Sequence, residues 1–148
     1  MKRIAAISVL VIAIGCKKNE EKLVLPAPVA QAPVAKCFVW TSGRDTIRLS
    51  YVPSDLNVTG QLAYLFYEKD QSSGTISGTF VGDTLFVDYK FKSEGMTSIR
   101  ETAFLKRGDS LIPGIGAVAF KDNREQIVNP HTLTFDPKGA LLKTSCPD

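Results

Sequence analysis

The sequence predicts an all-β fold: a small antiparallel up-and-down β-barrel of seven to eight strands, with a β-sandwich as the alternative. Three observations predict it. From Cys37 onward apolar and polar residues alternate with period two, turn-forming residues recur about every eight to twelve positions, and helical periodicity is not sustained anywhere. Closing the sheet into a barrel also removes the free edges that would template aggregation, which favours the barrel.

Residues 1–15 have the layout of a secretory signal peptide. Lys2 and Arg3 precede the apolar run Ile4–Ile14, and the run ends in small residues. At about 1.5 Å per helical residue the run reaches only about 16 Å, against a hydrocarbon core of about 30 Å. The run is therefore too short for a stable membrane span.

The stretch AIGC at 13–16 resembles the lipobox of bacterial lipoproteins. In that family the signal peptide is cut before a cysteine that is then diacylated on sulfur and acylated on its new amino group. The resemblance implies that Cys16 carries palmitate-type chains as a membrane anchor, and several such chains exceed what lasting attachment requires. The alternatives are an ordinary cleaved leader with a chance cysteine nearby, or an uncleaved anchor.

Residues 16–36 predict a lipidated cysteine followed by a disordered tether. Pro26, Pro28 and Pro33 prevent a helix from propagating through this Pro- and Ala-rich segment. The charged KKNEEK directly after Cys16 resembles the tags that carry some Gram-negative lipoproteins to the outer cell surface. The resemblance implies an outer-membrane location, with the folded domain on the periplasmic or the surface-exposed face.

The folded region, residues 37–148, contains a series of alternating segments. The cleanest is TLFVDYKFK at 84–92, which follows a tight Gly82–Asp83 turn and places its apolar residues on one side. The polar stretch KDNREQI at 121–127 is where a short helix could form. The other expected strands are TIRLSY at 46–51, Val58–Glu68, TISGTFV at 75–81, TSIRETAFLK at 97–106, SLIPGIGAVAF at 110–120, HTLTFD at 131–136 and ALLKTSC at 140–146.

The stretch GTISGTFVGDTLFVDYKF at 74–91 resembles the hairpin units of small lipocalin-like lipoprotein barrels from bacterial envelopes. That resemblance implies a lipocalin-like barrel and assigns no functional residues. A barrel of about eight strands has room only for packed side chains or one small ligand. Gly60, Gly78, Gly114 and Gly116 lie within expected strands, where bends or bulges would let such a barrel curve.

The cysteines predict one disulfide. If lipid occupies Cys16, Cys37 and Cys146 remain as an even pair in an oxidising compartment. A ring of about 100 residues would restrict the unfolded chain by roughly 4–5 kcal/mol at most. The alternatives are two free buried thiols or metal ligands, but the chain has a single histidine, His131, and no Cys-x-x-Cys spacing, which argues against a metal.

The sequence contains no recognisable catalytic or cofactor-binding constellation. There is no Ser or Cys with an adjacent base, no G-x-S-x-G, and GIGAV at 114–118 lacks the third glycine of a dinucleotide loop. Residues 37–148 carry twelve Lys and Arg against thirteen Asp and Glu, so the basic surface that nucleic-acid binding needs is absent. We therefore expect a protein that is not an enzyme and that uses no cofactor, metal or nucleic acid.

Glu68, Glu101 and Arg100 are the candidate site residues. If the apolar residues of 97–106 point inward, Glu101 shares their face, and Glu68 ends the apolar row that begins at Val58. Such carboxylates would be polar anchors in an apolar pocket. The alternative, which we favour, is structural: a salt bridge to Arg100 or Arg48 at one barrel mouth, or strand ends in water.

Together these features predict a monomeric, non-catalytic binding module, anchored to the membrane by lipid, for an unidentified envelope or extracellular partner. Exposed aromatic residues and loops such as SEGMTS at 93–98 would bind that partner. The alternative is a carrier or sensor of a small apolar ligand held inside the barrel near Glu101.

Overall fold

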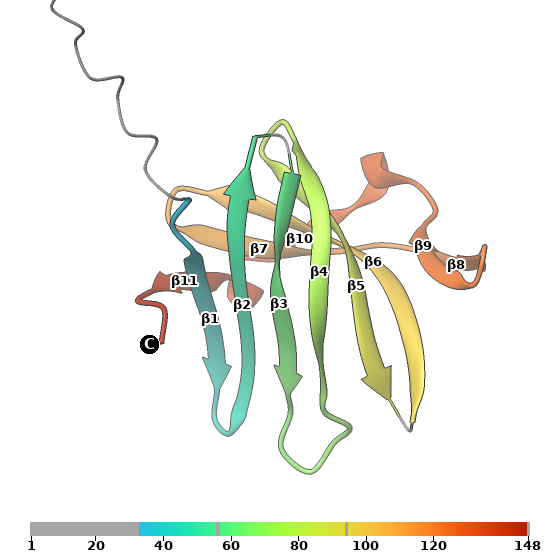
Figure 1. Ribbon diagram of the computed structural model, residues 1–148, viewed down its shortest axis with the longest axis horizontal. Coiled ribbons are helices and arrows are strands. Elements are labelled where there is room, and N and C mark those ends of the chain that lie inside the picture. The colour runs from blue at the N-terminus through green and yellow to red at the C-terminus, as the bar shows by residue number, and fades with distance from the viewer. Residues whose placement is uncertain (1–32, 56, 94, 148) are drawn as a thin grey trace, which may run out of the picture. The chain divides into compact units, whose positions relative to one another are not determined.

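The computed structural model describes residues 33–55, 57–93 and 95–147, which belong to one compact unit, Ala32–Asp148. Figure 1 shows its strands and two short 3-10 turns, η1 (Pro130–Thr132) and η2 (Pro137–Gly139). The strands are β1 (Lys36–Ser42), β2 (Asp45–Ser54), β3 (Asn57–Leu65), β4 (Ser72–Val81), β5 (Thr84–Ser93), β6 (Met96–Arg107), β7 (Ser110–Ile115), β8 (Val118–Lys121), β9 (Arg124–Ile127), β10 (Thr134–Phe135) and β11 (Leu141–Thr144).

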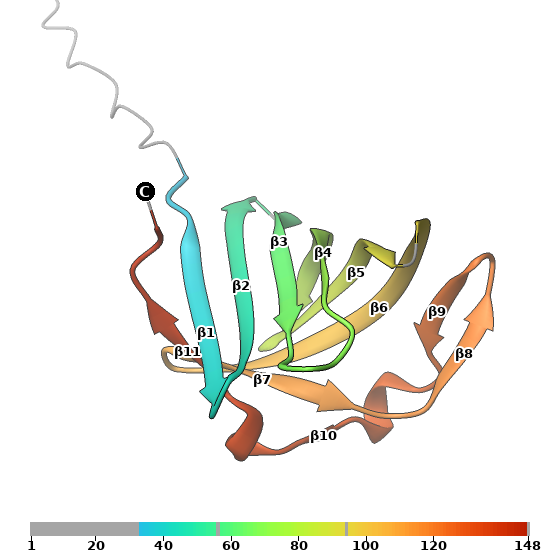
Figure 2. The same ribbon diagram turned by 90° about the horizontal axis from the view of Figure 1, so that it is seen from below.

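Eight of these strands close into an antiparallel barrel, which confirms the predicted fold class. Strands β1 to β7 are neighbours in chain order, β7 pairs with β11, and β11 pairs back onto β1. Figure 2 shows the wall of β1 to β6 curving round to β7. The short connections between consecutive strands impose this up-and-down order, because antiparallel neighbours can be joined by tight turns.

The core follows from the period-two pattern, because alternate residues of each strand point into the barrel. In β5, Leu85, Val87 and Tyr89 are almost fully buried, as predicted. Side chains from the other strands meet them in one cluster. Its members are Phe38, Leu49, Tyr51, Val58, Leu62, Ile76, Leu85, Val87, Tyr89, Phe104, Leu111 and Leu141.

Glycines in β3 and β4 allow neighbouring backbones to approach closely, as expected for Gly60 and Gly78. A Cβ atom at Gly60 would overlap the carbonyl oxygen of Ser50, and one at Gly78 would overlap that of Phe86. Gly74 meets the backbone of Lys90 in the same way. These positions therefore accept no side chain without a shift of the backbone.

The helix that residues 121–127 could have formed is not present, and β9 occupies most of this stretch. Asp122 and Asn123 have φ values of 51° and 60°, which make a tight hairpin turn between β8 and β9. The hairpin joins the barrel through β9, whose Glu125 is paired in parallel with Arg100 of β6. The polar composition suggested a helix because β9 is a short strand with no buried residue to mark its alternation.

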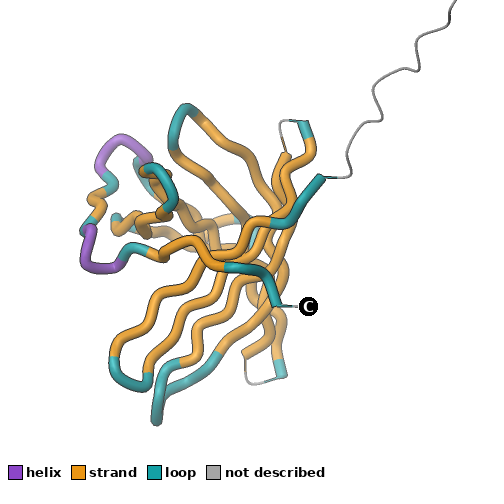
Figure 3. Tube along the Cα trace, turned by 90° about the vertical axis from the view of Figure 1, so that its left-hand side faces the viewer, coloured by secondary structure: helices purple, strands orange, loops and turns teal. Residues whose placement is uncertain are grey.

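The C-terminal third is more interrupted than predicted. The expected strand at 110–120 breaks into β7 and β8, and the expected strand at 131–136 begins with the 3-10 turn η1 and keeps only the short β10. Strands β10 and β11 both pair with β7, separated by η2. The Trp40 indole N–H donates to the carbonyl of Lys138 in η2, 3.0 Å away, which ties this turn to β1. Figure 3 shows both turns on the side of the barrel away from the C-terminal end.

Cys37 and Cys146 form the predicted disulfide, with an S–S distance of 2.08 Å. The bond links the beginning of β1 to the segment that follows β11, and these two strands also pair with each other. The covalent and hydrogen-bonded closures of the barrel therefore coincide.

Candidate functional site

Side chains fill the middle of the barrel, and the main candidate site is a cavity at one mouth. Its volume is about 620 Å³, and its lining comes from the end of β3 and the loop after it, the end of β5, the middle of β6, and the segment from the end of β7 to Leu133. Figure 2 shows the β8–β9 hairpin beside β6. The lining residues are Tyr64, Phe66, Asp70, Gln71, Ser72, Phe91, Arg100, Glu101, Thr102, Gly114, Ile115, Gly116, Val118, Glu125, Ile127 and Leu133.

Aromatic rings form one wall of this mouth cavity. Phe91 and Tyr64 both pack against Tyr89, which is buried behind the lining: Phe91 stacks on it with ring centroids 4.6 Å apart, and Tyr64 meets it edge-on at 5.8 Å. Phe66 continues the row, 6.0 Å from Tyr64. The rings come from β3, its following loop and β5, so they meet across β4. They can do so because β4 places only Ser72 opposite Tyr64.

The phenols of Tyr64 and Tyr89 are neutral. The hydroxyl of Tyr89 donates to Ser72 Oγ, 3.0 Å away. Burial raises the pKa of Tyr64, and the neighbouring Tyr89 raises it further, which outweighs the opposite effects of Thr102 and Arg100. Burial likewise raises the pKa of Tyr89. Both phenols therefore keep their protons at neutral pH.

Charged contacts hold the β8–β9 hairpin against the barrel. Arg124 donates to both carboxylate oxygens of Asp88 at 2.6 Å, reaching across β6 to β5. Glu125 forms an ion pair with Arg100. The backbone N–H of Ile127 donates to Glu101 Oε2 at 2.8 Å. We call these three contacts the hairpin clasp.

The predicted site residues lie differently from what we expected. In the register of β5 and β6, Tyr89 is opposite Arg100 and Asp88 is opposite Glu101. Because opposite residues share a face, Arg100 lies on the inner face with the core and Glu101 on the outer face. The expectation that Glu101 lies on the inward-pointing face of β6 is therefore wrong. Ala103 suggested it, because this residue is fully buried on the outer face, beside Gly114.

Glu68 is not part of the cavity. The expectation that its strand runs to residue 68 is wrong, because β3 ends at Leu65. Beyond it, the backbone N–H of Tyr67 donates to the side chain of Asp45 at 2.8 Å, and Glu68 is exposed with a φ of 54°. Of the predicted polar cluster, only Arg100 and Glu101 border the cavity.

Sequence reasoning missed Arg124 and Glu125, which supply two contacts of the clasp. The available signal was the pair Asp122–Asn123, because Asp and Asn tolerate the positive φ angles of a two-residue hairpin turn. The short polar stretches on either side obscured it.

Exposed apolar side chains gather around the same hairpin. Phe120 is 73% exposed on β8, Met96 is 68% exposed at the beginning of β6, and both border a notch of about 270 Å³. Ile115, Val118 and Val128 are also largely exposed. Strand β8 pairs only with β9, so within the described part of the chain its other edge is free. Figure 2 shows β8 as the outermost strand on this side.

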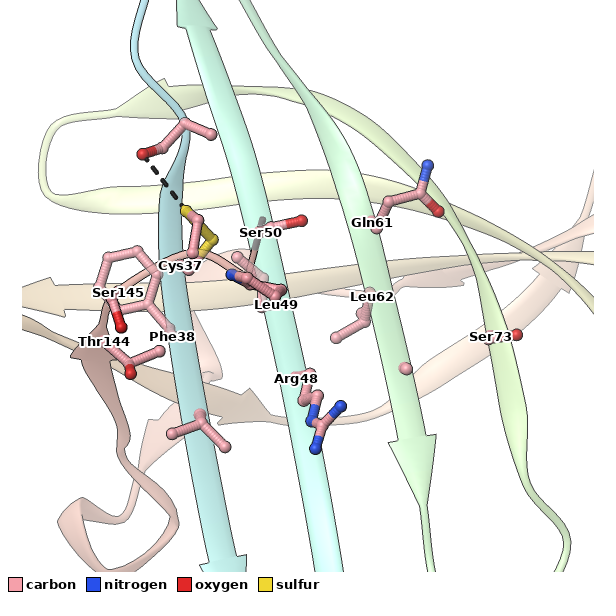
Figure 4. A pocket seen from close by; sticks show the side chains of 15 residues that line it. Cys37, Phe38, Arg48, Leu49, Ser50, Gln61, Leu62, Ser73, Thr144 and Ser145 are labelled. Carbon is pink, nitrogen blue, oxygen red and sulfur yellow. Dashed lines mark hydrogen bonds between the residues drawn. A yellow bond between two sulfur atoms is a disulfide. The ribbon is translucent and has the colours of Figure 1, made fainter.

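A second hollow, of about 720 Å³, lies near the disulfide. Figure 4 shows it over β1 to β4. The outward-facing side chains here, including Ser50, Gln61 and Ser73, are short or polar, and Arg48 is the one charged lining residue. This hollow contains none of the predicted site residues.

Within residues 33–147, apart from positions 56 and 94, no group of three or more His, Cys, Asp or Glu residues is placed to hold a metal ion. His131 is exposed in η1, where its backbone N–H donates to Asn129 Oδ1 at 3.0 Å. The described segments also contain no helix long and apolar enough to cross a membrane. Cys16, the predicted lipidation site, lies outside the described residues.

Comparison with family models, curated proteins and solved structures found no match to this chain.

Proposed function

We propose that this protein is a lipid-anchored, non-catalytic binding module of the bacterial outer membrane. The lipobox-like AIGC at 13–16 and the Pro-rich segment that follows support the anchor and the tether. The disulfide supports an oxidising compartment, because stable disulfides are rare in the cytosol.

The anchor is tested by mass spectrometry of the membrane fraction. The expected N-terminal peptide begins at Cys16 and carries acyl chains, and Cys16→Ser releases the protein from the membrane. Recovery of the uncleaved chain from cytosol would contradict the anchor.

The binding surface in this proposal is the free edge of β8, and the observation that carries it is that edge together with the exposed Phe120 and Val118. A free strand edge binds an extended peptide by main-chain hydrogen bonds, while flanking side chains provide specificity. The partner is thus an extended segment of another envelope protein.

Lys121, at the end of β8, indicates the charge of that segment. Among the ion pairs of the described residues, none involves its side chain. A segment that combines apolar and acidic residues would complement Phe120, Val118 and Lys121.

The surface is tested with a photo-crosslinking amino acid placed in living cells. At Phe120 it should give one discrete protein adduct. The matched control is Val81, which is 63% exposed and lies at the turn between β4 and β5, and no adduct is expected there. Equal labelling at both positions, or none at Phe120, would overturn the assignment of this edge.

A second candidate function is a carrier or sensor of a small ligand. The observation that favours it is the mouth cavity, since the filled core leaves the ligand to be held at the mouth. Val118 borders both the cavity and the β8 edge, but the aromatic rings of the cavity come from β3, the loop after it and β5, so this function is compatible with peptide binding at β8.

A further inference from the structure

The mouth cavity has the size and walls of a small-molecule site. Its volume of about 620 Å³ falls within the range of about 300–1,000 Å³ that such sites span. Aromatic rings form one side, and polar groups such as Ser72 and Thr102 stand among them. Many small molecules would fit a cavity of this shape, so the charges of its lining residues indicate which chemical class of ligand it binds.

The charged residues of the lining disfavour an anion. The lining contains three carboxylates, Asp70, Glu101 and Glu125, and one cation, Arg100. Glu125 forms an ion pair with Arg100, and Glu101 accepts the N–H of Ile127. Asp70 takes part in none of the ion pairs found among the described residues. The cavity therefore keeps an excess of negative charge, and an entering anion would be repelled.

A cation already lies over one ring of the aromatic wall. The guanidinium of Arg100 lies 5.6 Å from the ring centroid of Phe91. In the described segments the other rings with a cation above them are Tyr51 and Tyr67, so Tyr64 and Phe66 have none. Their rings are tilted by 47° and form a corner, and Asp70 lines the same cavity. Aromatic faces attract cations, most strongly away from water.

We propose that the mouth cavity binds a small organic cation, a substituted ammonium, with its charge in the corner formed by Tyr64, Phe66 and Asp70. The apolar substituents contact Ile127 and Leu133 on the opposite side. Val118 borders both this cavity and the β8 edge, but Tyr64, Phe66 and Asp70 lie on β3 and the loop after it, so the cation site does not depend on peptide binding at β8.

The test uses three probes of the same shape and different charge: choline, 3,3-dimethylbutan-1-ol and 3,3-dimethylbutanoate. Each is titrated into the full-length chain in a non-ionic detergent, and binding is followed by NMR and calorimetry. Choline should bind at one site about tenfold more tightly than the neutral alcohol, and the carboxylate most weakly, because the cation gains from both the rings and Asp70.

Variants localise the effect. Phe66→Leu and Asp70→Asn should each weaken choline binding about tenfold. Asp70 is exposed on a loop, so its replacement does not threaten folding. The controls are Glu68→Gln, on the same loop, and Phe86→Leu, outside the cavity, and both should leave binding unchanged.

Three outcomes would overturn the proposal: equal binding of choline and the neutral alcohol, tightest binding of the carboxylate, or no loss in the Phe66 and Asp70 variants. None of these outcomes bears on crosslinking at Phe120, so failure here is distinguishable from failure of the peptide-binding proposal.

Discussion

At the scale of single residues, small side chains are required at several positions of β4. Ser72 and Gly74 lie between β3 and β5, where larger side chains would separate the rings of Tyr64 and Tyr89. Gly78 has a different role, because its lack of a side chain lets the backbone of β4 pack closely against that of β5 in the barrel wall. The aromatic wall of the cavity thus depends on the absence of large side chains at these positions of β4 as well as on the rings themselves.

Gly78→Ala should destabilise the protein by about 1–3 kcal/mol, because the new Cβ overlaps the backbone of Phe86 and forces a strand to shift. Urea unfolding measures the loss. Ser77→Ala, at the adjacent exposed position on the same strand, is the control and should be nearly neutral. Equal stability of both variants would show that β4 and β5 are not so closely packed.

Tyr64 should make stability fall at alkaline pH. Its pKa in the folded protein is raised above the usual value of 10.0, so the unfolded chain loses this proton first and stability falls as pH rises through about 10. Tyr64→Phe removes that contribution, and its urea midpoint should fall less between pH 9 and pH 11. The exposed Tyr67→Phe is the control and should follow the wild-type profile.

At the scale of elements, the β8–β9 hairpin differs from the rest of the sheet. It contributes no residue to the buried core and is joined to β6 by a single parallel register pair. The hairpin clasp supplies much of its attachment. Because a clasp of charges on partly exposed residues is weaker than core packing, the hairpin should open locally while the barrel stays folded.

Asp88→Asn should loosen the hairpin alone. It removes the charge that Arg124 contacts, and the amides of β8 and β9 should exchange hydrogen about tenfold faster, with β2 to β5 unchanged. Asp83→Asn is the control: Asp83 pairs with Arg107, both side chains are more than 60% exposed, and exchange should not change. Acceleration throughout the sheet would mean that the hairpin and the barrel open together.

At the scale of the whole molecule, closure of the barrel brings the N-terminal strand β1 against the C-terminal strand β11. These strands share a short register, Cys37 to Val39 against Leu142 to Thr144. The disulfide lies at that junction, with its cysteines 109 positions apart. A covalent link at this point stabilises the pairing that local turns cannot provide.

Replacing both Cys37 and Cys146 by Ala should lower the free energy of unfolding by up to about 4–5 kcal/mol, because the unfolded chain regains the entropy of a large loop. Urea unfolding of the full-length chain measures this difference. Cys16→Ser is the control and should leave the transition unchanged. Two thiols that react with iodoacetamide in the untreated wild-type protein would contradict the bridge itself.

Much of the architecture was predictable because it is local. Period two identified the inner faces of β2 and β5, Gly82 marked the hairpin between β4 and β5, and the even cysteine pair indicated the bridge. The cavity was less predictable. Arg100 was among the predicted site residues, but the wrong face of its strand was predicted to point inward because Ala103 is buried on the outer face. Glu125 was missed because its strand is short and polar.

The sequence by itself therefore determined the all-β class, the closure by Cys37 and Cys146 and the alternation that fills the core, because these depend on neighbours along the chain or on counting cysteines. Only the tertiary structure decided that Tyr64 and Phe66 meet at a tilt in the lining of the mouth cavity, that Glu101 supports a hairpin from outside, and that β8 keeps a free edge within the described part of the chain. Those features depend on which strands meet across the barrel, and no local pattern carries that information.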